Sequence, residues 1–181
     1  MAVIVASSNG TVATRPKRRL SPPWRKAVVL VHVVSSVGWL GVSAGFVVLT
    51  LALLGTRDAA TLRGGYALHE LMVSWLARPA ALITLFTGLV LSFGTSWSLF
   101  RYWWVPTKLV LVVATIVVTI ANSPTLLRYT VQHADATGSP EYLSAQRWLV
   151  AMAVYHVVMI SAAAVLSVFK PGGRLARRRV R

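Results

Sequence analysis

The chain has 181 residues, of which 56% are hydrophobic and only 13% are charged, and its formal net charge is +15. This composition is too apolar for an ordinary soluble domain and indicates a membrane protein. Cysteine is absent, which excludes disulfide bonds, thiolate metal sites, iron–sulfur clusters and covalently attached haem.

Several apolar stretches are long enough to cross a bilayer, which requires about 20 apolar residues for each helix. We expect four spans, at residues 26–54, 66–94, 107–127 and 140–170. The predicted fold class is therefore all-α, a four-transmembrane-helix bundle with up-down topology over residues 25–170. Residues 1–24 are expected to form a disordered basic tail, and residues 171–181 a second basic tail.

The basic residues are unevenly distributed over the two sides of this topology. Clusters of Lys and Arg precede the first span, flank the second turn and follow the last span, whereas all 4 acidic residues fall on the other side. The positive-inside rule then places both termini in the cytoplasm. The tails do not form one folded patch, so we interpret them as topology signals that also attract anionic lipids, and we expect no nucleic-acid binding.

The first span carries small residues and one histidine. Gly41 and Gly45 lie four positions apart, which favours the close approach of a neighbouring helix; a cofactor packed against this face is the alternative. His32 and Ser36 are also four positions apart, and Trp39 follows, so we expect this set to face inward. His32 then forms a hydrogen bond between helices or acts as a ligand.

The second span contains a charged residue, Arg78, followed by Pro79. A guanidinium is costly in hydrocarbon, so Arg78 is expected to face protein or water. The alternative is that its side chain extends along Trp75 toward the outer interface. Pro79 lacks a backbone donor and is expected to bend the helix.

The third span carries polar residues on one helical stripe that we expect to face the bundle. These residues are Lys108, Thr115, Thr119 and Asn122. The fourth span is preceded by a start signal, a cap at Ser139, a first-turn proline at Pro140 and a first-turn acid at Glu141.

A rise of 1.5 Å per residue, counted from the cytoplasmic ends, places four residues near one level in mid-membrane. They are Trp39, Arg78, Asn122 and His156. We interpret them as a buried polar layer, which is either a self-contained structural cluster or a site for an anion or a carbonyl-bearing ligand.

Histidine and methionine residues also define a candidate metal or haem site. Met152, His156 and Met159 share one face of the last span; thioether and imidazole ligands suit Cu(I), although methionine is also a common core residue. For haem, the same count of helical rise sets His69 about 16 Å above His156, with His32 at a third level. We therefore expect no cofactor, and keep b-type haem or copper as the alternative.

Three segments carry a resemblance to a known family. They are HVVSSVGWLG from His32 to Gly41, FTGLVLSFGTSWSLFRYWWVPTKLVL from Phe86 to Leu111, and VLSVFKPGG ending at Gly173. Together they resemble an uncharacterised family of small actinobacterial integral-membrane proteins, and more distantly the copper-resistance D type of membrane domain. The resemblance covers most of residues 30–173 and implies a bacterial cell membrane, but no established activity.

Residues typical of common enzyme classes are missing from the spans, which contain no inward carboxylate pair, glycine-rich phosphate loop or Ser–His–acid set. The sequence thus favours a non-enzymatic accessory bundle, or one that handles small solutes or ions. The alternative is a membrane redox subunit that binds b-type haem or copper. The expected partners are the lipid bilayer and either a second copy of the chain or another membrane protein.

Overall fold

The computed structural model describes residues 20–94 and 102–170. Over these ranges the chain is helical, and four helices are long and apolar enough to cross a membrane. They are Pro22–Leu54, Ala59–Gly94, Trp104–Gln132 and Pro140–Phe169. The predicted all-α bundle with four membrane spans is confirmed. The tails at residues 1–19 and 171–181 and the turn at residues 95–101 lie outside the described residues.

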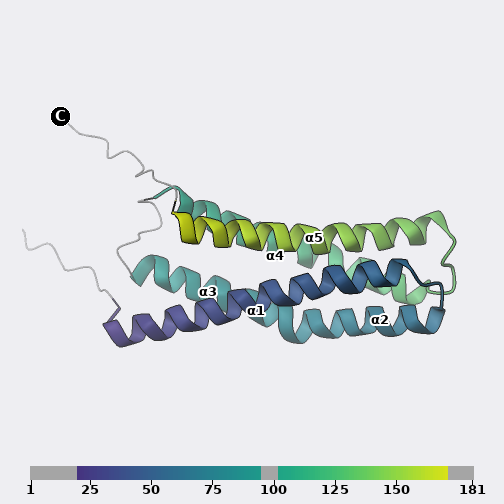
Figure 1. Ribbon diagram of the computed structural model, residues 1–181, viewed down its shortest axis with the longest axis horizontal. Coiled ribbons are helices and arrows are strands. Elements are labelled where there is room, and N and C mark those ends of the chain that lie inside the picture. Colours follow the sequence, from purple (N-terminus) through teal and green to yellow (C-terminus); the bar gives the residue numbers. More distant parts are fainter. Residues whose placement is uncertain (1–19, 95–101, 171–181) are drawn as a thin grey trace, which may run out of the picture.

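The spans run up and down along one long axis (Figure 1). The first is α1 (Pro22–Leu54), the third α4 (Trp104–Gln132) and the fourth α5 (Pro140–Phe169). The start of α1 and the end of α5 lie together at one end of the bundle, which we call the terminal end. The α1–α2 and α4–α5 connections lie at the opposite end, which we call the loop end.

The second span is interrupted in its middle. It consists of α2 (Ala59–Met72), the π-helical turn η1 (Val73–Ala77) and α3 (Arg78–Gly94). The Arg78 N–H donates to the Val73 carbonyl, five residues earlier rather than four. This widened turn ends at Ala77, two residues before Pro79, whose ring crowds the preceding turn of a regular α-helix and offers no N–H donor. The irregularity expected at the proline thus takes the form of a π-turn.

The helices form a four-cornered bundle. Helix α1 packs against α3 and α5, and α4 packs against α5 and α2. Among the described residues, the second span makes no close backbone contact with α5, so these two elements occupy diagonal corners. Side chains from both corners therefore face the centre of the bundle.

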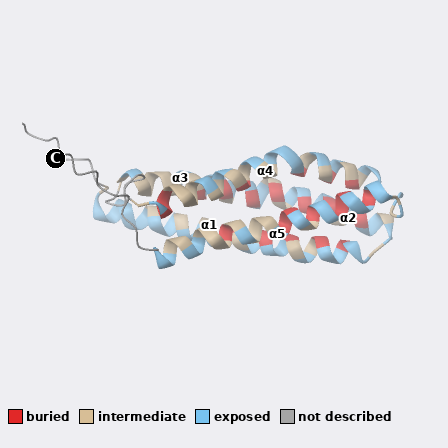
Figure 2. Cartoon of the chain, turned by 90° about the horizontal axis from the view of Figure 1, so that it is seen from above, coloured by how far each residue is buried: buried red, intermediate tan, exposed pale blue. Residues whose placement is uncertain are grey.

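Buried residues line the inside of the bundle, and exposed ones cover its outer faces (Figure 2). One apolar cluster, the loop-end core, comprises Leu53, Leu62, Tyr66, Leu127, Ala134, Tyr142 and Leu149. A second, the middle core, comprises Trp39, Phe46, Val73, Ala77, Ala81, Ala153 and Ile160. The many large apolar residues on the outer faces are suited to contact with lipid tails.

The glycines of α1 face outward in this arrangement. A Cβ added at Gly38, Gly41 or Gly45 would meet nothing within 4 Å, so no described helix packs closely on this face. Close approach occurs instead at Gly88, where an added Cβ would lie 3.2 Å from Cε1 of His32. The inward side of α1 is therefore the one that carries His32 and Trp39.

Two helix starts at the loop end are capped by side chains. Asp58 accepts a hydrogen bond of 2.8 Å from the Thr61 N–H at the start of α2. Ser139 accepts one of 3.2 Å from the Tyr142 N–H at the start of α5, which confirms the start signal predicted there. Each cap satisfies a backbone donor that the helix itself leaves unpaired.

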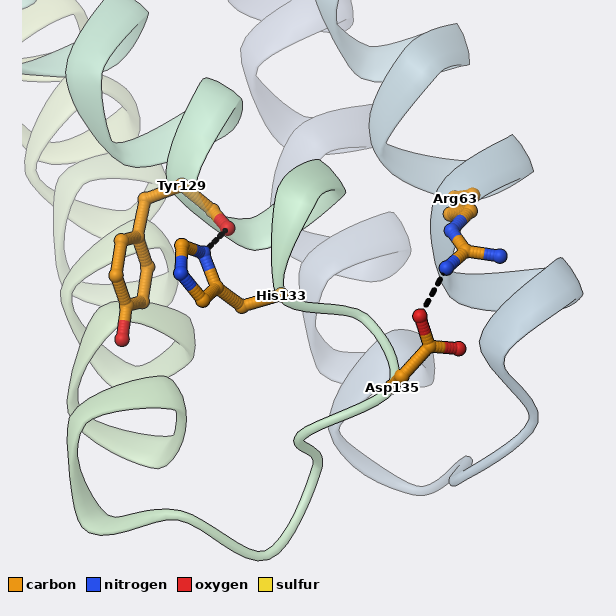
Figure 3. Close-up of polar contacts among 4 residues, drawn as sticks. All are labelled: Arg63, Tyr129, His133 and Asp135. Carbon is orange, nitrogen blue, oxygen red and sulfur yellow. Dashed lines mark hydrogen bonds and ion pairs between the residues drawn. The ribbon is translucent and has the colours of Figure 1, made fainter.

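An ion pair also joins α2 to the α4–α5 connection at the loop end (Figure 3). Arg63 of α2 donates to the carboxylate of Asp135, which follows α4. Beside it, the ring of His133 stacks on Tyr129 with 4.2 Å between the ring centroids. Both partners of the ion pair are exposed, so it orders the surface but adds little stability.

Candidate functional site

A cavity of about 360 Å³ lies between the four spans, in the middle of the bundle. Its size is within the range of pockets for small organic ligands, about 300–1,000 Å³. Most of its lining is apolar, including Trp39 and Phe46 from α1 and Met152 from α5. Several polar side chains interrupt this lining: Ser43, His69, Glu70, Ser74, Arg78, Thr119, Ser123 and His156.

His69 is the most unusual of these polar residues. It is 5% exposed, and its ring lies against the Phe46 ring with 4.2 Å between centroids. Its Nδ1 is buried and has no hydrogen-bond partner among the described residues. Tyr142 Oη is likewise buried without a described partner, but Tyr142 does not line the cavity. His69 thus combines an unsatisfied polar atom with a place in the cavity wall.

Arg78 lies at the junction of η1 and α3 and is exposed, yet it lines the cavity. Its guanidinium forms no hydrogen bond or ion pair with any residue in the described ranges, and its backbone N–H is the one that donates to Val73. Glu70 lines the same cavity but is eight positions away, about 12 Å along a helix. The guanidinium donors therefore remain available to a ligand.

His156 faces the cavity from the diagonal corner and is already hydrogen-bonded. Its Nδ1 lies 2.6 Å from the Met152 carbonyl oxygen, and its Nε2 is bonded to the hydroxyl of Thr119. Because a carbonyl can only accept, Nδ1 carries the proton in neutral His156, and the single Thr119 hydroxyl proton is shared between Nε2 and the Thr115 carbonyl oxygen at 2.7 Å. This pair links α5 to α4 at the cavity wall.

A comparison with protein families places this architecture among membrane proteins. The family model described as "Predicted integral membrane protein (DUF2269)" matches residues 26–171. The chain belongs to this family. No curated protein and no solved structure matches the chain. Membership of DUF2269 agrees with the four spans, and the family's description names no activity.

In this DUF2269 member, three of the four residues predicted to form the polar layer line one cavity. Trp39, Arg78 and His156 are in its wall. Asn122 is not: it is exposed, and its amide donates to the Val118 carbonyl of its own helix at 2.9 Å. These three lining residues come from three helices, while the side chain of Asn122 lies outside the cavity wall.

The other predicted inward residues lie nearer the terminal end or in the helix contacts. His32 Nδ1 is 3.1 Å from the Thr84 carbonyl oxygen and 2.9 Å from Thr87 Oγ1, so it links α1 to α3. Ser36 donates to the His32 carbonyl, and buried Thr115 donates to that of Leu111. None of these three residues lines the cavity.

The predicted metal or haem residues separate in the same way. Met152, His69 and His156 line the cavity, whereas Met159 and His32 do not. No group of three or more His, Asp or Glu side chains suited to a metal ion occurs in the part of the chain that the structure describes. His69 and His156, calculated from helical rise to lie about 16 Å apart in depth, nevertheless face one cavity from diagonal helices.

Several cavity residues were not part of the predicted layer, notably Glu70, Ser74 and Ser123. Two stripes of four-residue spacing on the second span contain a signal for Glu70 and Ser74. Residues 70, 74 and 78 form one stripe of polar residues, and residues 69, 73, 77 and 81 form the adjacent, mostly small one. Adjacent stripes of this kind define one face of a helix, which in the structure is the cavity wall.

Proposed function

We propose that the protein is a non-enzymatic membrane bundle that binds a small, largely apolar solute, with separate polar contacts at Arg78 and at His69, which are nine positions apart on the second span. The observation that carries this proposal is the unpaired Nδ1 of His69 in the cavity wall. A buried polar group without a partner costs about 1–3 kcal/mol in protein mutational data. A solute that hydrogen-bonds to this nitrogen removes that cost.

The rest of the lining supports the same proposal. Trp39, Phe46 and Met152 provide an apolar surface for the body of a solute. Arg78 supplies a charged donor with no described counter-ion. A few polar groups within an apolar wall are typical of ligand sites, where the apolar surface gives affinity and the polar groups fix orientation.

Phenylalanine substitutions at two alanines of α5 test this function. Ala153 is 4% exposed and lines the cavity, whereas Ala151, two residues earlier, is exposed on the outer face. Ala153→Phe fills the cavity, and Ala151→Phe is the matched control. The proteins are extracted from native membranes into lipid nanodiscs, and bound small molecules are identified by mass spectrometry.

We expect one solute with the wild-type protein and with Ala151→Phe, and its loss with Ala153→Phe. Circular dichroism checks that both variants keep the helical content of the wild type. The same small molecules in equal amounts from all three proteins would refute solute binding in the cavity.

The alternative function, a redox subunit that binds b-type haem or copper, is favoured by one observation. His69, His156 and Met152 line the same cavity. This function corresponds to the more distant resemblance to copper-resistance D type domains. As a ligand through Nε2, His156 would exchange its bond to Thr119 for the metal.

Absorption spectroscopy and elemental analysis of the purified protein separate the two functions. A Soret band, or copper that disappears with His156→Ala, would favour the redox subunit over the solute-binding bundle. A colourless protein without copper is the result expected for the solute-binding bundle.

We further propose an actinobacterial cell membrane as the location, with the terminal end in the cytoplasm. The basic residues before α1 and after α5 support this orientation through the positive-inside rule. Because the chain has no cysteine, single cysteines can be placed cleanly at Arg57 and Lys170. We expect a membrane-impermeant maleimide to label intact cells with Arg57→Cys but not those with Lys170→Cys.

The proposed partners are anionic lipids and a second membrane-spanning chain. The basic tails attract anionic headgroups. The outward face of α1, with Gly38, Gly41 and Gly45 open, is the surface on which a helix of a second copy or of another membrane protein would pack.

A further inference from the structure

Within residues 20–94 and 102–170, the cavity opens on one side of the bundle. Its exposed lining residues are Glu70, Arg78, Leu82 and Ile120. All of them belong to the second span or to α4. The lining residues contributed by α1 and α5 are buried or half-buried. The opening therefore lies between the second span and α4.

Both elements that flank this opening are irregular helices. The second span contains the π-turn Val73–Ala77, followed by Pro79, and α4 contains Pro124, which itself lines the cavity. A π-turn or an internal proline breaks the regular ladder of backbone hydrogen bonds and bends a helix. At membrane depth, such breaks are tolerated where the backbone adjoins a cavity or other protein. Both irregularities therefore lie beside the opening, at the level of the cavity.

The opening faces lipid tails. Leu82 is 53% exposed and Ile120 is 65% exposed, and both lie within membrane spans. Exposed apolar side chains at this depth contact acyl chains, so a molecule that passes between them comes from the hydrocarbon layer and not from water.

We propose that the gap between α3 and α4 is a lateral portal through which a single-chain carboxylic acid dissolved in the bilayer enters the cavity. The carboxylate pairs with Arg78 and the apolar chain occupies the space beside Trp39. This inference rests on the proposed solute-binding function and adds to it the class of solute and the route of entry.

The charge at the opening selects the acidic headgroup. A guanidinium binds a carboxylate through two parallel hydrogen bonds, and such charged bonds are about twice as strong as neutral ones. Arg78 has no ion pair with a described residue, and Glu70 is about two turns away. An acid from the membrane supplies the counter-ion that the chain itself does not place there.

Fluorescence quenching of Trp39 tests the proposal directly. Trp39 is 3% exposed and lines the cavity, so a brominated chain quenches it only from inside. The probe is stearic acid brominated in mid-chain, added to nanodiscs that contain the full chain, and its methyl ester is the uncharged control. The Trp39 signal is the difference between the wild-type protein and Trp39→Phe.

We expect the acid to quench Trp39 and the methyl ester to do so at about tenfold higher concentration, the factor that corresponds to about 1.4 kcal/mol. Arg78→Gln should remove the difference between the two probes, whereas Arg128→Gln, at an exposed position that does not line the cavity, should keep it. Equal quenching by acid and ester on the wild-type protein would overturn the acidic headgroup, even if Arg78→Gln does not fold.

The portal is tested by the rate of quenching. Ile120→Phe narrows the gap, and Val117→Phe is a matched control, because Val117 is 58% exposed on the same helix but does not line the cavity. We expect quenching about tenfold slower with Ile120→Phe and unchanged with Val117→Phe. Equal rates in these two variants would overturn the portal. The solute-binding function is judged separately, by the mass spectrometry of Ala153→Phe.

Discussion

His32 near the terminal end and His69 in the middle of the bundle are the same residue type but have opposite surroundings. Near the terminal end, His32 is bonded to Thr84 and Thr87, and Lys108 donates to Ser167 at 2.9 Å. In the middle, His69 Nδ1 has no described partner. The comparison teaches that residue type does not identify a site in a membrane bundle, whereas unsatisfied bonding capacity beside a cavity does.

The loop end is more closely packed than the middle of the bundle. Leu62 is 0% exposed within the loop-end core. Gln146 of α5 donates to the Tyr66 hydroxyl at 3.0 Å and to the Leu53 carbonyl at 3.4 Å, across three helices. The loop end is thus closely packed beside a more open middle.

Removal of a side chain from the closed loop end should give the largest effect. Leu62→Ala is expected to lower the free energy of unfolding by about 2–5 kcal/mol, because it leaves a void in a fully buried position. Leu82→Ala, at the mouth of the cavity, should change it by only about 0.5 kcal/mol, as expected for an exposed site. Denaturant unfolding in detergent measures both. Equal losses would remove the distinction between closed and open regions.

Replacement of His69 should raise the free energy of unfolding rather than lower it. His69→Phe keeps an aromatic ring against Phe46 and removes the unpaired nitrogen, so we expect the solute-free protein to gain about 1–3 kcal/mol. The measurement is the same unfolding titration after delipidation. A loss of stability would mean that His69 is bonded within the protein, and the middle of the bundle would then resemble its ends.

Replacement of His32 tests the closed side with the same residue type. His32→Leu should lower stability by about 0.6 to 1.7 kcal/mol, the range measured for side-chain hydrogen bonds within membrane bundles. A double-mutant cycle with Thr87→Val isolates the bond of 2.9 Å between the two side chains. We expect coupling in that cycle and none when Thr87→Val is combined with His69→Phe. Coupling in the second cycle would contradict the separation of the two regions.

The sequence was sufficient to predict the fold because lipid leaves the backbone few choices. An apolar run must be helical to satisfy its own hydrogen bonds, so the length of each run predicts a span. The start of α5 could be predicted equally well, since Ser139 and Pro140 act through local backbone chemistry. These features depend on neighbours in the sequence.

The candidate site was harder to predict from the sequence, because it depends on how the helices are rotated about their axes and shifted along them. The depth calculation used a uniform rise, whereas the second span contains a π-turn between His69 and Pro79. Asn122 was placed inward by its spacing from Thr115 and Thr119. Its amide is bonded to its own helix, so it needs no partner in the bundle. The spacing of polar residues predicts which residues share a face of one helix. It does not predict which faces of different helices pack against each other.

The smallest expected effect lies at the edge of the closed loop end, where Asp58 caps α2. Its carboxylate accepts bonds from the hydroxyl of Thr61 at 2.6 Å and from the Thr61 N–H at 2.8 Å, and these bonds lower the pKa of Asp58 below its ordinary value. A lowered pKa in the folded state means that the charged cap stabilises the protein above the unfolded pKa of about 3.9. That contribution is lost as the pH falls through the lower, folded pKa.

Asp58→Asn keeps a good capping residue but removes the titrating charge. The difference in melting temperature between the wild-type protein and this variant should therefore shrink as the pH is lowered from about 6 to about 3. Asp58→Ala, which removes the cap altogether, should be less stable than Asp58→Asn across this range. A difference in melting temperature between wild type and Asp58→Asn that does not depend on pH would contradict this role of the carboxylate. The start of α2 would then be stabilised by its packing on α1 and α4.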